Sequence, residues 1–267
     1  MTRRVVRHSL LAFLLSLAAA AAFAQATATQ KPFEPQVGQA GKDVVWVPTS
    51  QTLVDKMLDM AKVTPQDYLM DLGSGDGRTV ITAAKRGLRA MGIEYNPDMV
   101  ELSRKNALAA GVGERATFVK ADLFETDFSQ ATVITMFLLP QINMKLRPKI
   151  LDMKPGTRVV SNTFTMEDWE ADETQTVGGE CQTWCTALFW IVPAKVGGTW
   201  KMPQGELTLN QKFQMITGTL GTTQVTGRLR GADITFTGGG TTYTGRVNGN
   251  TIQGNAGSSA FTATKVR

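Results

Sequence analysis

The sequence predicts an α/β domain with a doubly wound parallel sheet, followed by a small all-β domain of antiparallel strands. Apolar segments with strand and helix periods alternate between residues 51 and 162, which is typical of repeated strand–helix–strand units. After Pro193 the composition changes to Thr and Gly, with short alternating segments. A glycine-rich loop lies between the first strand and the helix that follows it, which favours a ligand site at that turn.

The α/β pattern begins with a helix that we expect from Ser50 to about Lys62, with Ser50 as its N-cap. Strands are then expected at 68–72, 89–94, 116–120, 132–138 and 157–162, and helices at 78–86, 97–110 and 143–152. The strand at 132–138 is expected to be covered on both faces. Pro97 stands at an early helical position, where its missing N–H is tolerated. Together these segments predict a parallel sheet with helices on its faces.

The segment after Pro193 predicts a second domain built as a meander of hairpins. Short strands are expected at 206–209, 224–229, 233–236, 242–247 and 261–266, with turn sequences about every ten residues. The high Thr and Gly content is also compatible with a low-complexity tail. A period-2 apolar face, as in Ile234 and Phe236, favours the folded interpretation.

The first residues have the features of an export signal. Three arginines precede an apolar run from Leu10 to Phe23, and the small residues Ala22 and Ala24 fit a cleavage site after Ala24. The run is shorter than the roughly 20 residues of a membrane-spanning helix, and no later segment is long enough. We therefore expect a periplasmic or secreted protein without a transmembrane segment in its mature chain. An uncleaved anchor and a twin-arginine signal, suggested by Arg3 and Arg4, are the alternatives.

Four regions follow from these patterns. We expect a signal peptide at 1–24, a flexible leader at 25–45, the α/β domain at 46–193 and the all-β domain at 194–267. Cleavage after Ala24 leaves 25 Lys and Arg against 23 Asp and Glu, without a basic run, so we expect no nucleic-acid partner. His8 is the one histidine, and it lies in the signal segment. The mature chain is therefore expected to use no histidine-based nucleophile and no metal site.

Cys181 and Cys185 are the two cysteines of the chain, and an exported protein can join them by a disulfide. Residues four apart on a strand lie roughly 13 Å apart, whereas a disulfide needs Cα atoms within about 7 Å. A bridge therefore requires a turn or bulge at this point. Two buried free thiols are the other interpretation.

The segment from Asp71 to Gly77 carries the chemistry that the sequence shows best. Its glycines allow a tight strand-to-helix turn and close approach of a ligand to the backbone. Glu94, 17 residues after Gly77, ends the next strand, where a carboxylate can accept both ribose hydroxyls. Asp122 ends the third strand, where it can accept from the exocyclic amine of adenine. Three acids at three successive strand ends indicate one nucleoside site.

Two kinds of nucleoside ligand fit such a site. A nicotinamide dinucleotide would match Gly-x-Gly-x-x-Gly, but the glycines here are Gly73, Gly75 and Gly77. A carboxylate at Asp71, close before the first glycine, attracts a sulfonium or ammonium and repels a diphosphate. The residues therefore favour S-adenosylmethionine.

The chain resembles the class I lysine N-methyltransferases that act on the ATP synthase c-ring and on the adenine nucleotide translocase, with their prokaryotic relatives. The residues that carry the resemblance are Val47-Pro48, Asp71-Leu-Gly-Ser-Gly-Asp-Gly-Arg78, Ala83-Ala-Lys-Arg-Gly87, Gly92-Ile-Glu-Tyr-Asn-Pro97, Ser103-Arg104, Asp122-Leu123, Phe128-Ser-Gln130, Pro140-Gln141 and Asp168-Trp169. The resemblance implies a Rossmann-like methyltransferase sheet, S-adenosylmethionine as cofactor, and protein lysine as acceptor. The Thr- and Gly-rich β domain is a departure from these relatives.

The cofactor-binding residues expected from the motif and the resemblance are Asp71, Gly73, Ser74, Gly75, Gly77, Glu94, Asn96, Asp122 and Leu123. Candidates for the acceptor channel are Phe137 and Pro140 at the end of the fourth strand, with Asp168 and Trp169 on the acceptor side. Ordinary core positions and a structural Trp are the alternatives. Because S-adenosylmethionine is made in the cytosol, an exported chain is also compatible with a non-enzymatic S-adenosylmethionine-binding or scaffold protein whose β domain binds a partner or the cell envelope.

Overall fold

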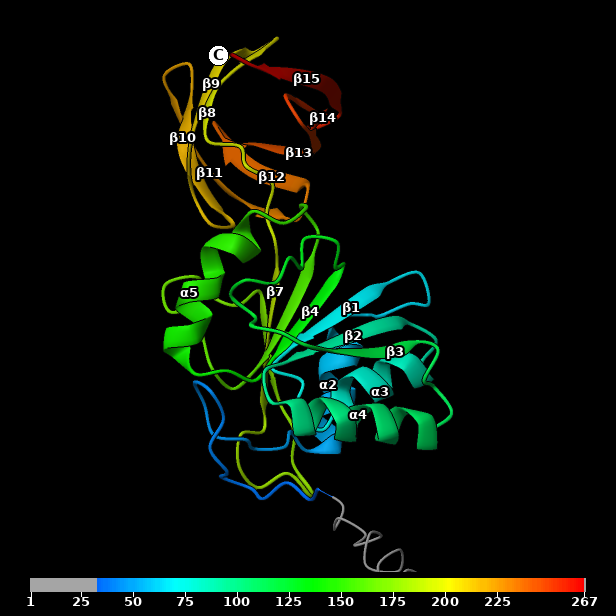
Figure 1. The fold of residues 1–267 in the computed structure, drawn as a ribbon. Helices are drawn as coiled ribbons and strands as arrows, with labels where there is room; N and C mark the ends of the chain where they lie inside the picture. Colours follow the sequence, from blue (N-terminus) through cyan, green and yellow to red (C-terminus); the bar gives the residue numbers. More distant parts are fainter. Residues whose placement is uncertain (1–32, 267) are drawn as a thin grey trace, which may run out of the picture. The chain divides into compact units, whose positions relative to one another are not determined.

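A computed structural model describes residues 33–266 of the chain. The expected signal peptide and the first part of the expected leader, 25–32, lie outside the described residues. The described residues from Pro35 onward form one compact unit. Within it, a mixed sheet flanked by helices and a closed barrel of antiparallel strands follow each other in the sequence (Figure 1). The structure thus confirms the expected order of an α/β part and an all-β part.

The seven-stranded sheet has the order β3-β2-β1-β4-β5-β7-β6. Its strands are β1 (Tyr68–Leu72), β2 (Arg89–Glu94), β3 (Ala116–Lys120), β4 (Val133–Met136), β5 (Arg158–Asn162), β6 (Glu173–Thr176) and β7 (Thr186–Ile191). Strands β1 to β5 are parallel, and β1 pairs with β2 on one side and with β4 on the other. The strand order therefore reverses beside β1, and ligands of open α/β sheets bind outside the carboxyl ends at such a point.

Helices cover both faces of this sheet (Figure 1). The helices are α2 (Gln51–Met60), α3 (Arg78–Lys85), α4 (Pro97–Ala109) and α5 (Pro140–Leu151). Residues of α2, α3 and α4 share one apolar core with the sheet, and residues of α5 share the other. Ser50 caps α2 by accepting a hydrogen bond from the backbone N–H of Leu53, as the sequence predicts.

Most expected elements of this part are confirmed to within a few residues at their ends. Helix α5 begins at Pro140, earlier than expected, because Pro140 takes the first helical position. The strands β6 and β7 are additional to the expected ones. Strand β7 runs antiparallel to β5, with Asn162 opposite Ala187, so the loop 177–185 between β6 and β7 lies at the carboxyl end of β5. The loop between β6 and β7 therefore lies at the same edge of the sheet as the glycine loop.

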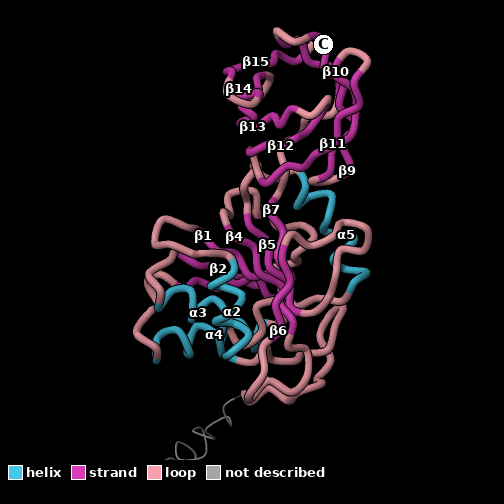
Figure 2. Tube along the Cα trace, turned by 180° about the vertical axis from the view of Figure 1, so that it is seen from behind, coloured by secondary structure: helices cyan, strands magenta, loops and turns pink. Residues whose placement is uncertain are grey.

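The C-terminal part is a closed eight-stranded barrel (Figure 2). Its strands are β8 (Gly198–Met202), β9 (Gly205–Lys212), β10 (Met215–Leu220), β11 (Thr223–Arg230), β12 (Asp233–Gly238), β13 (Thr241–Asn248), β14 (Thr251–Ala256) and β15 (Ser259–Lys265). Pairing of β15 with β8 closes the ring and removes exposed strand edges. Trp200 and Phe236 fill its core. The folded meander is confirmed, and the closure is new information.

The end of the expected leader is ordered. Residues Ala40 and Val45 form a bridge, and the backbone of Gly38 and Gln39 exchanges hydrogen bonds with Trp46. Backbone pairing therefore holds residues 36–45 of the expected flexible leader, even though the segment lacks a periodic apolar pattern. Among the described residues, no helix is long and apolar enough to cross a membrane.

Candidate functional site

A cavity of about 540 Å³ opens at the carboxyl ends of the central strands. It is lined by the glycine loop, by the ends of β2, β3 and β4, and by three segments from elsewhere: the strap 39–49, Phe164 after β5, and Trp184 in the loop between β6 and β7. Most of the expected cofactor-binding residues line it, namely Asp71, Gly73, Ser74, Gly75, Glu94, Asn96, Asp122 and Leu123. The structure therefore brings these residues together where strand order reverses.

The glycine loop packs so closely against its neighbours that a side chain would clash. A Cβ on Gly75 would come within 2.6 Å of the Trp46 indole nitrogen, and Gly75 has a positive φ of 53°. Gly77 does not line the cavity. It is the N-cap of α3 with a φ of 83°, and a Cβ there would strike the Phe118 ring at 2.7 Å. Its role is to let the loop turn into the helix rather than to touch a ligand.

Glu94 holds the loop from the next strand. Its carboxylate accepts hydrogen bonds from the backbone N–H of Gly75, at 3.0 Å, and of Asn96, at 2.9 Å. The side chain of Asn96 caps α4 by accepting from the backbone N–H groups of Asp98 and Met99. One carboxylate thus fixes the glycine loop and the start of α4 at the rim of the cavity.

Asp71 is a buried acid in the floor of the cavity. It accepts a hydrogen bond of 2.7 Å from the hydroxyl of Thr135 on the neighbouring strand β4. Burial raises the pKa of Asp71 to about 7, and the negative charges of Glu94 and Asp76 also raise it, whereas the bond from Thr135 lowers it. A cation placed beside Asp71 would reverse this shift, because it favours the charged carboxylate.

Asp122 follows the end of β3, where Lys42 of the strap meets it. The two side chains form an ion pair, and the hydrogen bond from Lys42 holds the pKa of Asp122 below its usual value. The ammonium of Lys42 also lies 4.9 Å from the centroid of the Tyr95 ring. Lys42 thus ties the strap to the ends of β2 and β3.

The remaining end of the cavity is apolar and aromatic. Phe137, Leu138 and Leu139, which follow β4, line it together with Phe164 and Trp184. Phe137 stacks on Phe164 with 5.8 Å between ring centroids and lies 5.9 Å from Trp184. Phe137, a candidate of the sequence analysis, is thus among the lining residues. Pro140 is not among the lining residues, because it starts α5.

The expectation that Asp168 and Trp169 lie on the acceptor side is wrong. Trp169 is fully buried, stacks on Phe213 at 5.9 Å, and accepts at its backbone carbonyl a hydrogen bond from the Trp190 indole. Asp168 pairs with Arg147 and Lys212. Neither residue lines the cavity. A buried ring in face-to-face contact with another ring has no free face for a cationic amine.

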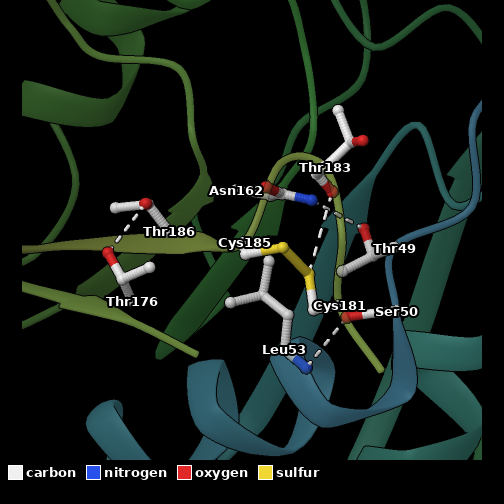
Figure 3. Close-up of a disulfide and its surroundings, with 9 residues drawn as sticks. All are labelled: Thr49, Ser50, Leu53, Asn162, Thr176, Cys181, Thr183, Cys185 and Thr186. Atoms are coloured by element: carbon white, nitrogen blue, oxygen red, sulfur yellow. Dashed lines mark hydrogen bonds between the residues drawn. A yellow bond between two sulfur atoms is a disulfide. The ribbon is translucent and has the colours of Figure 1, made fainter. Parts of the chain in front are cut away.

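Cys181 and Cys185 are joined by a disulfide with 5.8 Å between Cα atoms, which decides between the two interpretations (Figure 3). The bridge closes a bend in the loop between β6 and β7, so the turn that the spacing requires is present. Sequence reasoning missed Trp184, which lies inside this ring, and missed Trp46 and Lys42 in the strap. The cysteine spacing was the available signal for Trp184, since a bridged turn fixes the residues within it.

Comparisons with known proteins agree with this geometry. Residues 71–173 match the family model described as the ANTKMT methyltransferase domain. A protein-lysine N-methyltransferase of Saccharolobus islandicus is 46% identical over 133 residues, which are 49% of this chain and 83% of that protein. A lysine N-methyltransferase of Mus musculus named for ATP synthase is 38% identical over 48% of this chain and 52% of its own length. The chain thus spans about half the length of the mouse protein.

A solved structure is similar over the same region. The RNA methyltransferase of Salinibacter ruber, in complex with S-adenosyl-L-homocysteine, is 47% identical, has a TM-score of 0.53, and is matched over 56% of this chain and 96% of its own. Nothing in these comparisons favours the non-enzymatic alternative.

Replacing Asp71 with Asn tests its raised pKa. An acid whose pKa rises from 3.8 to about 7 on folding stabilises the fold at low pH, and that contribution is lost as pH rises from about 4 to about 7. The Asp71→Asn variant has no such titration. Between pH 5 and pH 8 the wild type should lose about 2–3 kcal/mol of unfolding free energy relative to this variant. Urea unfolding at both pH values measures this, and equal pH dependence of the two proteins contradicts it.

Replacing Trp169 tests its assignment to the core. Trp169→Ala should lower the free energy of unfolding by about 3–5 kcal/mol. Trp169→Phe should lose less, because Phe keeps the stacking on Phe213 and removes an indole N–H that has no partner among the described residues. Trp169→Phe should bind S-adenosylhomocysteine with unchanged affinity in calorimetry. A tenfold weaker affinity for S-adenosylhomocysteine in this folded variant would show that Trp169 belongs to the site after all.

Proposed function

Because the chain belongs to the ANTKMT methyltransferase family, whose members use S-adenosylmethionine, we propose that it methylates the side-chain amine of lysine in a protein. The observation that carries the proposal is the joining of an acidic donor pocket to an apolar aromatic end in one cavity. The first feature suits a cationic donor, and the second suits a long alkyl amine.

The residues present fit S-adenosylmethionine. The hydroxyl of Ser74 is buried and has no partner among the described residues, although Ser74 lines the cavity. A buried hydroxyl without a partner is costly, so a ligand that bonds it is favoured. Gly75, which also lines the cavity, has no side chain to separate its backbone from a ligand. Asp71 would hold the cationic methionine part, Glu94 the ribose hydroxyls and Asp122 the adenine amine.

The chain contributes to the reaction mainly by alignment and by excluding water. S-adenosylmethionine supplies a methyl group on a positive sulfur, and the electron pair of the broken C–S bond stays on sulfur while the amine lone pair forms the C–N bond. The lysine amine, with a pKa near 10.4 in water, must first give its proton to solvent. The aliphatic wall of Leu138 and Leu139 excludes water, which disfavours the charged ammonium and so lowers the pKa of the amine.

Lysine in a protein is the acceptor that the relatives favour. Lysine N-methyltransferases are 46% and 38% identical to this chain over about 130 residues. An RNA acceptor is the competing interpretation, from the name of the similar Salinibacter protein. The donor cavity is lined by five acids and two basic residues, and this negative charge disfavours a polyanion at the site.

The function is tested by methyl transfer from radiolabelled S-adenosylmethionine to two acceptors, an envelope-protein extract and total RNA. Label in protein, released as methyl-lysine after hydrolysis, is expected. Glu94→Gln should weaken S-adenosylhomocysteine binding at least tenfold and lower the label equally, because the carboxylate anchors both the glycine loop and the ribose. Glu114→Gln, an exposed acid outside the cavity, is the matched control. Label in RNA alone would refute the lysine assignment.

We also propose that the protein works outside the cytosol. The basic, apolar and small-residue order of its first 24 residues supports export, and the Cys181–Cys185 disulfide suits an oxidising compartment. Fractionation and N-terminal sequencing of the protein from cells provide the test. A periplasmic protein that starts at Gln25 is expected, whereas a cytosolic protein with its first residues intact would refute export.

A further inference from the structure

The loop between β6 and β7 reaches the acceptor end of the cavity. Strand β7 begins at Thr186, and its second residue pairs with Asn162 at the carboxyl end of β5. The backbone N–H of Val177 donates to the carbonyl of Cys185, which closes the base of the loop. A segment far from the glycine motif in the sequence thus forms one wall of the site.

Trp184 is held in this loop in an unusual way. Its φ is 55°, in the left-handed region that costs a bulky residue about 1–2 kcal/mol. The next residue, Cys185, is bridged to Cys181 (Figure 3). Trp184 therefore lies inside a closed ring of five residues, 181–185. The bridge restricts the loop and can keep Trp184 at its positive φ, whereas without the bridge the backbone can move to a negative φ. The disulfide is therefore a support for the position of Trp184.

The indole of Trp184 is 40% exposed although it lines the cavity. It faces Phe137 at 5.9 Å with a 60° tilt, and Phe137 stacks on Phe164. The charged lining residues belong to the strap, the segment Asp71–Arg78 and the ends of β2 and β3, so the segments that form the aromatic end contribute no charged residue to the lining. Recognition of a cation there falls to ring faces.

We infer that Trp184, held by the Cys181–Cys185 disulfide, forms with Phe137 and Phe164 the subsite that binds the acceptor amine. This inference rests on the proposed function and assigns its acceptor side. As the C–N bond forms, positive charge grows on the nitrogen, and the ring faces stabilise it without requiring an N–H. Methylated and unmethylated ammonium groups therefore both fit.

The test uses the folded protein loaded with S-adenosylhomocysteine and the probe tetramethylammonium, with tert-butanol as a neutral probe of similar size. The indole N–H signal that disappears from the NMR spectrum of Trp184→Phe identifies Trp184. That signal should shift with tetramethylammonium in a saturable way and much less with tert-butanol. Equal shifts with both probes, or no shift at all, would overturn the cation subsite.

Variants separate the parts of the inference. The double variant Cys181→Ser, Cys185→Ser should lose at least tenfold in tetramethylammonium affinity and keep its affinity for S-adenosylhomocysteine within twofold. Gln182→Ala, exposed within the same ring, should behave as wild type. With the lysine acceptor, Trp184→Ala should raise KM at least tenfold at unchanged donor affinity, and Trp184→Phe should restore most of it. An unchanged double variant would remove the role of the disulfide.

Loss of donor affinity gives a different answer. If Trp184→Phe weakens S-adenosylhomocysteine binding tenfold, Trp184 belongs to the donor pocket and the inference is wrong. If the wild type itself does not bind S-adenosylhomocysteine, the proposed function fails, whatever Trp184 does with tetramethylammonium. Failure of the subsite and failure of the function are therefore distinguishable.

Discussion

The hydrogen bond from Thr135 to the buried carboxyl group of Asp71 joins the two strands between which the sheet reverses its order. Burying an acid is costly unless it is paired or neutral. In this fold the cost is met at a position where a cation can be bound, and the raised pKa of Asp71 reflects it. The glycine loop begins directly after β1, so its position depends on the pairing of β1 with β4.

The donor and acceptor sides of the cavity are built in different ways. Donor contacts come from strand ends and from the glycine loop, which the hydrogen bond from the backbone N–H of Gly75 to Glu94 holds in place. The acceptor side comes from a bridged loop and from residues after β4 and β5. Because the acceptor side is supported separately from the donor side, the acceptor-side loops can change without disturbing the donor contacts. One sheet can therefore serve different acceptors.

The sequence predicted the parts of this structure whose causes are local. Periodic apolar residues indicated the central strands, and the acids at the ends of β1, β2 and β3 were found because parallel strands end at one edge. The prediction failed where contacts between segments far apart in the sequence decide whether a residue lies in the site. Asp168 and Trp169 looked like a recognition pair, but packing of Trp169 on Phe213 of the barrel part removes it from the site. Trp184 becomes a site residue only through the pairing of β7 with β5, which no local pattern reveals.

The claim that Asp71 binds the cationic part of the donor is tested most directly by the protons released on binding. Calorimetric titration with S-adenosylmethionine at about pH 6.5, in two buffers of different ionisation enthalpy, measures this number. An acid with a pKa of about 7 is mostly protonated there and becomes charged beside a cation, so more than about half a proton should leave per donor bound. Asp71→Asn should release none. Donor binding without proton release in the wild type would contradict the account.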